Sequence, residues 1–381
     1  MTNRQDPHLA TPSGKPRARS FGLPFDGEPG PNNAITDVPG VTVGYATLIS
    51  GDGALVSGSG PVRTGVTAIL PRPRDRIAEP VFAGIFSGNG NGELTGSHLI
   101  EEIGAFNLPI TITNTHSCGV ARDGTLRWAH GLAPGALDDA WALPVAGETY
   151  DGFLNDINGH HLTFDHVTAA LDGASPGPIE EGSVGGGTGM ITCAFKAGSG
   201  TASRLVGWEG RRYALGVFVQ SNFGERRNLT VRGVRAGPEL AEPAIREGTA
   251  RAEKSSIIAI VATDAPLMPH QLKRIARRVP LGVAATGGYG YHSSGDIFLA
   301  FSTANAEAAT GASGRLAHAE YVPDVDIDRF FDATVQATEE AILNSLTANE
   351  DMTGRDGNHV PALPKDWLRT RFREETSSAI R

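Results

Sequence analysis

Two short apolar runs in the last third of the chain constrain the fold more than any other feature. IIAIVA (Ile257–Ala262) and DIFLAF (Asp296–Phe301) are too short for buried helices, and they are typical of strands with both faces covered. Each run has a predicted amphipathic helix after it, at Pro269–Arg278 and Asp328–Leu346. Earlier in the chain, further strands are predicted at Gly65–Leu70, Pro80–Phe86, Leu108–Asn114 and Tyr213–Gln220. Strands and helices do not alternate strictly, which favours an α+β layered sandwich over a doubly wound sheet.

Composition excludes several classes of protein. Apolar residues make up 40% of the 381 residues, so the chain can bury a large core, and its 49 glycines have no collagen period. The net charge of -9, without a basic block, argues against a nucleic-acid partner. No apolar run reaches transmembrane length, so no membrane association is expected. Two cysteines cannot form a disulfide framework, and with no signal peptide visible we expect a cytoplasmic protein.

The chain is predicted to form one folded domain. Residues 1–22 carry charge and proline, and we expect them to be a flexible N-terminal tail, with a single domain over 23–381. Pro238–Lys254 is polar and predicts a helix that frays into an exposed linker. The last thirty residues are predicted to be a tail or an oligomer contact.

Three motifs have simpler explanations than catalysis. Gly185–Gly189 (GGGTG) lacks the lysine of a phosphate-binding loop and is followed by a predicted strand, so a closely packed turn or a pocket-lining backbone is favoured. His116 and Cys118, read as one strand face, could pair as base and thiol nucleophile, but a buried structural cysteine is favoured. His160 and His161 lack any metal-ligand spacing and are interpreted as solvated turn residues, so no metal is expected.

Ser256 stands where a polar linker meets a buried strand. Cleavage of the bond before it would give this residue a free α-amine, with a pKa of roughly 8, beside its own hydroxyl. Nucleophile and base would then belong to one residue. Spacing alone is a weak signal, because many strands begin with serine.

Three other segments would suit this chemistry, although capping or turn formation explains each one as well. Asn222 ends a strand and could donate its amide to an oxyanion. Ser294 and Asp296 could share a face and orient the amine of the nucleophile. Glu148 and Tyr150 could bind a substrate ammonium and steady a reacting oxygen.

Seven segments together resemble the L-aminopeptidase D-Ala-esterase/amidase family (DmpA), which includes the β-peptidyl aminopeptidases. They lie between about residues 32 and 364: NAITDVPGVTVG, ETYDGFLNDIN, EGSVGGGTGMI, VQSNFG, SIIAIVATDAPLMPHQLKRIARR, SGDIFLAFSTAN and MTGRDGNHVPALP. The resemblance implies a four-layer αββα sandwich, like that of N-terminal nucleophile hydrolases. It also implies self-cleavage into residues 1–255 (α chain) and 256–381 (β chain), which then assemble as oligomers, commonly tetramers of the two-chain unit.

The resemblance also implies roles for individual residues. Ser256 would be the nucleophile and Asn222 the oxyanion donor, while Ser294 and Asp296 would be its serine and acid partners. Glu148 and Tyr150 would lie in the substrate pocket. The family usually has glycine before the nucleophile, whereas this chain has Ser255, whose Cβ could slow or shift cleavage by one residue.

The expected function is therefore that of a cofactor-independent serine aminopeptidase or amidase. It would release N-terminal residues from small peptides, amides or esters through an acyl-enzyme. The acyl residue could be an L-amino acid, D-alanine or a β-amino acid. Two alternatives are an acyltransferase like the ornithine acetyltransferases, which share the fold, and a non-catalytic oligomeric binding protein that never matures.

Overall fold

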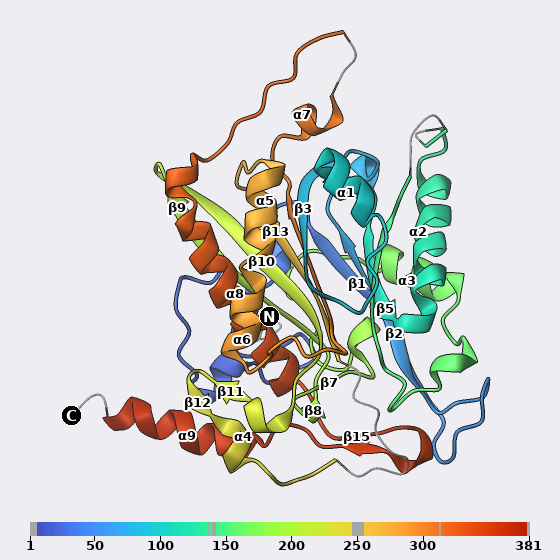
Figure 1. The fold of residues 1–381 in the computed structure, drawn as a ribbon, viewed down its shortest axis with the longest axis vertical. Coiled ribbons are helices and arrows are strands. Elements are labelled where there is room, and N and C mark those ends of the chain that lie inside the picture. The colour runs from blue at the N-terminus through green and yellow to red at the C-terminus, as the bar shows by residue number, and fades with distance from the viewer. Residues whose placement is uncertain (1–5, 136, 139–141, 246–254, 312–313, 379–381) are drawn as a thin grey trace, which may run out of the picture.

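Two β-sheets are stacked face to face in this computed structural model, which describes residues 6–135, 137–138, 142–245, 255–311 and 314–378 (Figure 1). The four-stranded sheet has the order β1 (Thr42–Ser50), β2 (Val62–Leu70), β5 (Ile110–Asn114), β6 (Val145–Thr149). The six-stranded sheet has the order β4 (Ala105–Phe106), β3 (Val81–Gly90), β14 (Gly295–Ser302), β13 (Ser256–Thr263), β10 (Arg211–Asn222), β9 (Ser199–Trp208).

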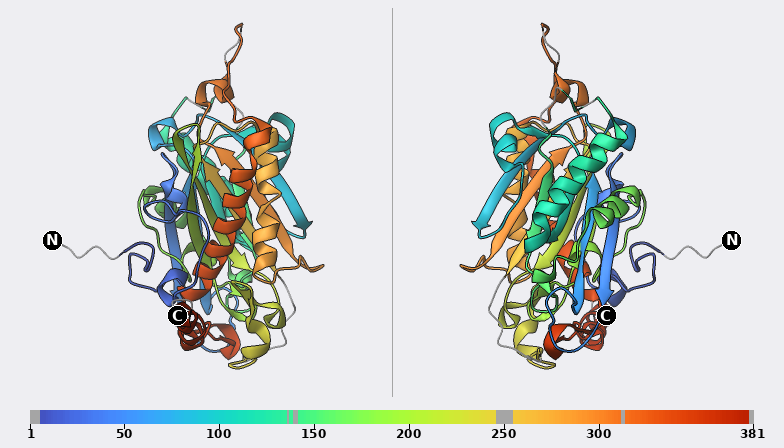
Figure 2. Two further views of the ribbon diagram at one scale, coloured as in Figure 1. Left: turned by 90° about the vertical axis from the view of Figure 1, so that its left-hand side faces the viewer. Right: turned by 90° about the vertical axis from the view of Figure 1, so that its right-hand side faces the viewer.

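Helices cover the outer face of each sheet, so the molecule is a four-layer αββα sandwich, as the sequence predicts (Figure 2). The four-stranded sheet is covered by α2 (Cys118–Leu132) and α3 (Phe164–Asp172). The six-stranded sheet is covered by α5 (Pro269–Ala276), α6 (Val279–Ala285) and α8 (Asp328–Thr347). Outside the layers lie α1 (Ser97–Ile103), α4 (Ala236–Glu239), α7 (Ala306–Thr310) and α9 (Lys365–Ser378), with three short strand pairs: β7–β8 (Ile191–Thr192, Phe195–Lys196), β11–β12 (Thr230–Val231, Val234–Arg235) and β15–β16 (Met352–Thr353, His359–Val360).

Strand β13 is apolar throughout because both of its faces are buried. Ile258 and Ile260 pack between the two sheets, whereas Ile257 and Val261 pack against the helices. Side chains alternate along a strand, so Ser256 lies on the same face as Ile258, towards the other sheet. β13 pairs in parallel with β14 and antiparallel with β10, which places it in the middle of its sheet.

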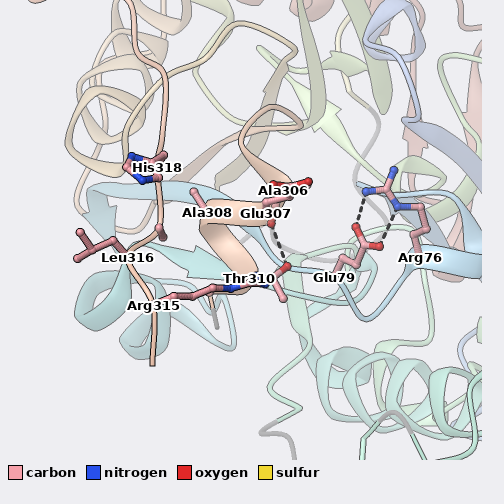
Figure 3. Close-up of a pocket in the computed structure, with 11 residues that line it drawn as sticks. Arg76, Glu79, Ala306, Glu307, Ala308, Thr310, Arg315, Leu316 and His318 are labelled. Atoms are coloured by element: carbon pink, nitrogen blue, oxygen red, sulfur yellow. Dashed lines mark hydrogen bonds and ion pairs between the residues drawn. The ribbon is translucent and has the colours of Figure 1, made fainter. Parts of the chain in front are cut away.

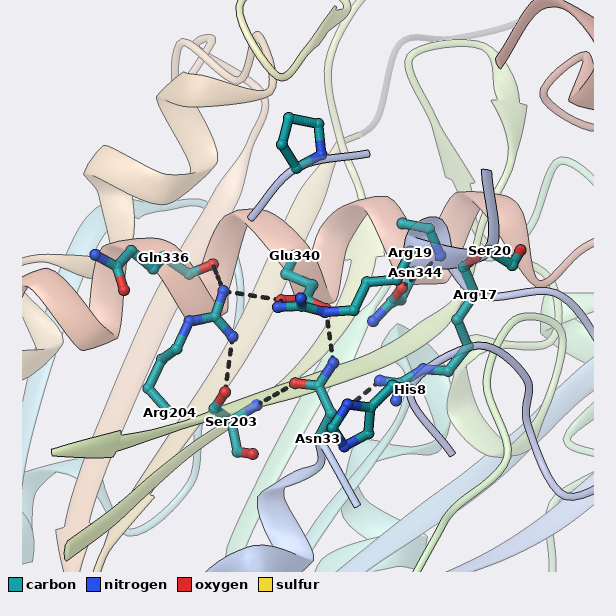
Figure 4. Close-up of polar contacts among 12 residues, drawn as sticks. His8, Arg17, Arg19, Ser20, Asn33, Ser203, Arg204, Gln336, Glu340 and Asn344 are labelled. Carbon is teal, nitrogen blue, oxygen red and sulfur yellow. Dashed lines mark hydrogen bonds and ion pairs between the residues drawn. The ribbon is translucent and has the colours of Figure 1, made fainter. Parts of the chain in front are cut away.

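The N-terminal segment is not a flexible tail from residue 6 onward, contrary to the prediction from its composition. Arg17 is 3% exposed, and its Nε lies 2.7 Å from Glu181 Oε2. Arg19 binds Glu340 of helix α8 through two hydrogen bonds of 2.6 and 2.8 Å. Glu340 Oε2 also lies 2.8 Å from Arg204 Nη2 in an ion pair. A buried polar network thus attaches the N-terminal segment to α8 (Figure 4).

Three further predictions need correction. The strand predicted around His116 and Cys118 ends at Asn114, whose side-chain oxygen accepts the backbone N–H groups of His116 and Ser117 before α2 begins. The helix predicted over Pro238–Lys254 stops at Glu239, and residues 246–254 lie outside the described part. The described C-terminal residues pack on the domain, since Leu363, Leu368 and Phe372 share a core cluster with Phe21.

A long arm carrying α7 projects from one end of the sandwich (Figure 1). Residues 306–308, 310–311 and 315–318 of this arm line a surface hollow together with the Arg76–Glu79 ion pair (Figure 3). Leu316 in the arm is 85% exposed. None of the helices in the described residues has the length and apolar character needed to cross a membrane.

Candidate active site

The predicted site residues meet where strands of both sheets end. In the sheet register, Ser256 pairs with Asn222 of β10 on one side and with Gly295 of β14 on the other. Ser256 is 5% exposed, and Asn222 faces the four-stranded sheet as Ser256 does. A central strand thus holds the hydroxyl with a neighbour on each side.

The Ser256 hydroxyl points back at the peptide bond that precedes it. Its Oγ donates a hydrogen bond to the carbonyl oxygen of Ser255 at 2.6 Å. The same carbonyl oxygen accepts the backbone N–H of Gly295 at 3.1 Å. Two donors therefore polarise the carbonyl that self-cleavage would attack. Sequence reasoning did not identify Gly295 as a hydrogen-bond donor, because its donor is the backbone N–H group and not a side chain.

Asn222 is held from two directions. Its Oδ1 accepts the backbone N–H of Ile191 at 2.9 Å, and its Nδ2 donates to the backbone carbonyl of Tyr150 at 3.0 Å. The carboxamide orientation follows from these two contacts, and the second N–H of Nδ2 remains to serve as an oxyanion donor.

Ser294 and Asp296 contact each other beside Ser256. Ser294 Oγ donates to Asp296 Oδ1 at 2.5 Å, and both residues flank Gly295. A register shift between Asp296 and Ile297 marks a β-bulge at this point, a feature that often re-aims side chains next to active sites. Burial raises the pKa of Asp296, although the hydrogen bond from Ser294 opposes this shift.

Glu148 approaches the site from β6, at the edge of the other sheet. It is 3% exposed, and its Oε1 accepts the backbone N–H of Glu93 at 2.9 Å. A Cβ added to Gly92 would lie 3.2 Å from Glu148 Oε1 and also 3.2 Å from Gly295 Cα. The Glu148 carboxylate therefore lies close to Gly295, the residue that pairs with Ser256. Burial raises the pKa of Glu148, with a smaller opposing effect from a Thr115 hydrogen bond.

Tyr150 contributes its carbonyl to the site, and its ring folds over Gly152. The next residue, Asp151, is 1% exposed and was not singled out by sequence reasoning. Its Oδ1 accepts Asn155 Nδ2 at 3.0 Å, while its Oδ2 has no hydrogen-bond partner. Burial raises the pKa of this carboxyl from 3.8 to about 7.

The glycine loop and the thiol take structural roles. Residues Gly185–Gly187 form a buried turn between the sheets, where a Cβ on Gly186 would lie 2.1 Å from Gln220 Oε1. The loop is thus a close-packed turn. Burial raises the pKa of the Cys118 thiol to about 12, and Cys118 Sγ donates to the carbonyl of Ala146. A protonated, buried thiol is a poor nucleophile.

The fold and the family matches define an N-terminal nucleophile hydrolase of the serine aminopeptidase type. The model of "Peptidase family S58" matches residues 33–360, and the chain belongs to this family. It is 49% identical to a beta-peptidyl aminopeptidase of Sphingosinicella microcystinivorans over 93% of this chain and 91% of that protein. A second beta-peptidyl aminopeptidase, from Sphingosinicella xenopeptidilytica, is 46% identical over 93% and 90% of the two chains.

Solved structures agree with this assignment. The L-aminopeptidase D-Ala-esterase/amidase of Ochrobactrum anthropi, described as a variant of the Ntn hydrolase fold, matches with a TM-score of 0.89 and 46% identity, covering 95% of this chain and 99% of that chain. A beta-aminopeptidase of Burkholderia sp. matches with a TM-score of 0.84 and 42% identity, covering 94% and 98%. These matches confirm the predicted family, and they favour a hydrolase over the acyltransferase and the non-catalytic alternatives.

Proposed function

We propose that this aminopeptidase activates itself by cutting the Ser255–Ser256 bond and then uses Ser256 as its N-terminal nucleophile. The observation that carries the proposal is the 2.6 Å hydrogen bond from Ser256 Oγ to the carbonyl oxygen of Ser255. The same oxygen also accepts the backbone N–H of Gly295, so two donors polarise this carbonyl. The products would be residues 1–255 and 256–381.

In the first stage, Ser256 Oγ attacks the Ser255 carbonyl carbon. The Cα-linked nitrogen of Ser256 leaves as an amine and takes the proton, so the amide becomes an ester. Gly295 N–H donates a hydrogen bond to the carbonyl oxygen of Ser255, which becomes negative in this step. Water then hydrolyses the ester, which releases the Ser255 carboxylate and restores the hydroxyl beside a free α-amine.

In the second stage, the Ser256 α-amine accepts the hydroxyl proton while Oγ attacks the carbonyl of the substrate's first residue. Asn222 Nδ2 donates to the oxyanion, and removing one such donor raises the barrier by roughly 3 to 4 kcal/mol. Ser294 and Asp296 orient the amine. When the tetrahedral intermediate collapses, the bond between the carbonyl carbon and the leaving amine or alkoxide breaks, and the leaving group takes the proton from the α-ammonium of Ser256. Water then hydrolyses the acyl-enzyme, which releases the carboxylic acid and regenerates Ser256.

Glu148 selects substrates that carry a free N-terminal ammonium, because a buried carboxylate is stabilised by a positively charged ligand. The substrate class is small peptides and amino-acyl amides or esters. We include β-amino acyl residues among the substrates, since the two curated relatives are named beta-peptidyl aminopeptidases.

Intact mass and a denaturing gel test the proposal. The purified protein should give two fragments divided between residues 255 and 256. Ser256→Ala should remain one chain and hydrolyse no amino-acyl amide. Ser302→Ala is a matched control, because Ser302 is a buried serine at the far end of β14, whose hydroxyl donates to the carbonyl of Ala265. An active single chain, or an active Ser256→Ala variant, would refute the assignment.

We further propose a homo-oligomer of cleaved units, a tetramer, in the cytoplasm. Support comes from the projecting arm and its neighbourhood, where Leu316, Tyr321 and Val325 are 85%, 58% and 88% exposed. Cys118 and Cys193 are buried and form no disulfide with each other, which suits a reducing compartment.

A further inference from the structure

Lys196 is a fully buried lysine that pairs with no carboxylate in the part of the chain that the structure describes. It lies in β8, is 0% exposed, and its Nζ donates to the carbonyls of Met190 at 2.9 Å and Ala197 at 2.6 Å. Burial holds the pKa of this amine well below its usual value. The two backbone carbonyls accept two of the N–H groups of this amine.

The lysine closes a short hairpin that carries unusual backbone. Ile191 pairs with Lys196 and Thr192 pairs with Phe195 across β7 and β8. The turn between them places Cys193 and Ala194 at φ angles of 50° and 58°, a left-handed conformation that non-glycine residues seldom adopt. A turn of this kind persists only where surrounding contacts hold it.

This hairpin also forms hydrogen bonds with the end of β10. Ile191 N–H donates to Asn222 Oδ1 at 2.9 Å. On either side of Asn222, Thr192 Oγ1 contacts Ser221 Oγ at 2.7 Å, and Cys193 N–H donates to the Phe223 carbonyl at 2.8 Å.

One peptide group connects the lysine to the asparagine. The carbonyl of Met190 and the N–H of Ile191 belong to the same planar unit, and they point in opposite directions in a trans peptide. Lys196 Nζ and Ala197 N–H bind the carbonyl, at 2.9 and 3.1 Å, and the N–H binds Asn222. The direction of the N–H, and hence the orientation of the Asn222 amide, depends on the contacts at the carbonyl.

We propose that Lys196 is a positioning residue that sets the Asn222 carboxamide for oxyanion stabilisation through the Met190–Ile191 peptide. The inference rests on the proposed role of Asn222. It also explains a costly choice of residue, since burying an amine without a counter-charge is less favourable than burying an apolar side chain of similar length.

A double-mutant cycle in kcat tests the proposal. Lys196→Met keeps the buried stem and removes both donors. Rates for an amino-acyl amide are divided by the amount of cleaved 256–381 fragment, measured by intact mass, so that a defect in self-cleavage is not counted as a defect in turnover. A small misplacement of a catalytic donor can cost about 100-fold, and we expect Lys196→Met to lower kcat by about 10- to 100-fold with KM within about twofold.

Coupling to Asn222 distinguishes positioning from general support of the fold. In an Asn222→Ala background, Lys196→Met should lower kcat by less than about threefold, because the donor that it positions is already gone. Arg204→Met is the matched control: it removes another fully buried cationic side chain, far from the site, and should lower Tm without changing kcat. Lys196→Gln retains an N–H donor, and we expect its kcat to be intermediate.

Two different failures can be told apart. If Asn222→Ala leaves kcat unchanged, the proposed oxyanion role of Asn222 fails. If Asn222→Ala lowers kcat but Lys196→Met does not, or if the two losses multiply, only the positioning role of Lys196 is overturned. That role is also overturned if neither Lys196 variant folds while Arg204→Met does, since the lysine would then be a structural residue alone.

Discussion

Asp151 lies one residue from Tyr150, in a place where a carboxylate is poorly supported. It is 1% exposed, its Oδ1 accepts Asn155 Nδ2, and its Oδ2 has no hydrogen-bond partner among the described residues. Burial raises its pKa from 3.8 to about 7. We predict that Asp151→Asn, which removes the charge and keeps the shape, stabilises the protein at alkaline pH.

The sign and size follow from proton linkage. Between pH 3.8 and about 7 the folded state keeps a proton on Asp151 that the unfolded state has lost, so the stability due to this group falls as pH rises through that window. Each unit of pKa shift corresponds to about 1.4 kcal/mol, which gives a penalty of roughly 4 kcal/mol at about pH 8.5 and roughly 2 kcal/mol at about pH 5.5. Asp151→Asn should gain these amounts.

Urea unfolding at the two pH values measures the gain. The parent should be Ser256→Ala, so that every protein compared is a single chain and the free energy of unfolding does not depend on fragment association. Equal gains at both pH values, or a loss at about pH 8.5, would refute the reasoning.

Glu340→Gln is an internal control of opposite sign. Burial alone would raise the pKa of Glu340, but the hydrogen bond from Arg19 and the charge of Arg204 hold it below its usual value. The carboxylate is then ionised in both states across the measured window, so the loss on substitution should be the same at both pH values.

Two further predictions concern processing and substrate binding. Ser255→Gly should cleave itself several-fold faster than the parent, whereas Ser255→Ala should not, because only glycine gives the backbone at residue 255 additional conformational freedom. The cleaved fraction is measured against time. Equal cleavage rates for the two variants would contradict this prediction. Glu148→Gln should raise KM for an amino-acyl anilide by about 10- to 100-fold with little change in kcat, since a hydrogen bond to a charged group contributes about 1.5–3 kcal/mol. In the parent, KM should rise as pH falls through the raised pKa of Glu148, and a pH-independent KM would contradict its role.

The layered fold and the strand ends could be predicted from local sequence. IIAIVA and DIFLAF are apolar on both faces because a sheet or a helix layer lies on each side, and they form β13 and β14. Helix α2 was missed because its glycines and polar residues hide the apolar stripe that packs on the sheet. The N-terminal segment was misjudged because the carboxylate partners of Arg17 and Arg19 lie more than 160 residues away.

The candidate site likewise contains residues that could be predicted from the sequence and residues that could not. Residues that we propose to act through side chains, such as Asn222 and Asp296, lie at strand ends that motifs can indicate. Gly295 and Ile191 contribute backbone N–H groups, and any residue but proline supplies one, so sequence carries no signal for them. Asp151 owes its raised pKa mainly to burial, with a smaller contribution from the charge of Glu148, and both effects exist only in the folded chain.

The central position of β13 has a consequence for the chain end that cleavage creates. A new N-terminus normally frays, because few contacts hold it. Here the terminal residue would begin a strand that pairs along its whole length with β10 and β14. The reacting amine and hydroxyl would therefore lose their conformational entropy when the precursor folds, and not at each turnover. Folding of the precursor would thus supply a share of the rate enhancement once, for every substrate molecule that follows.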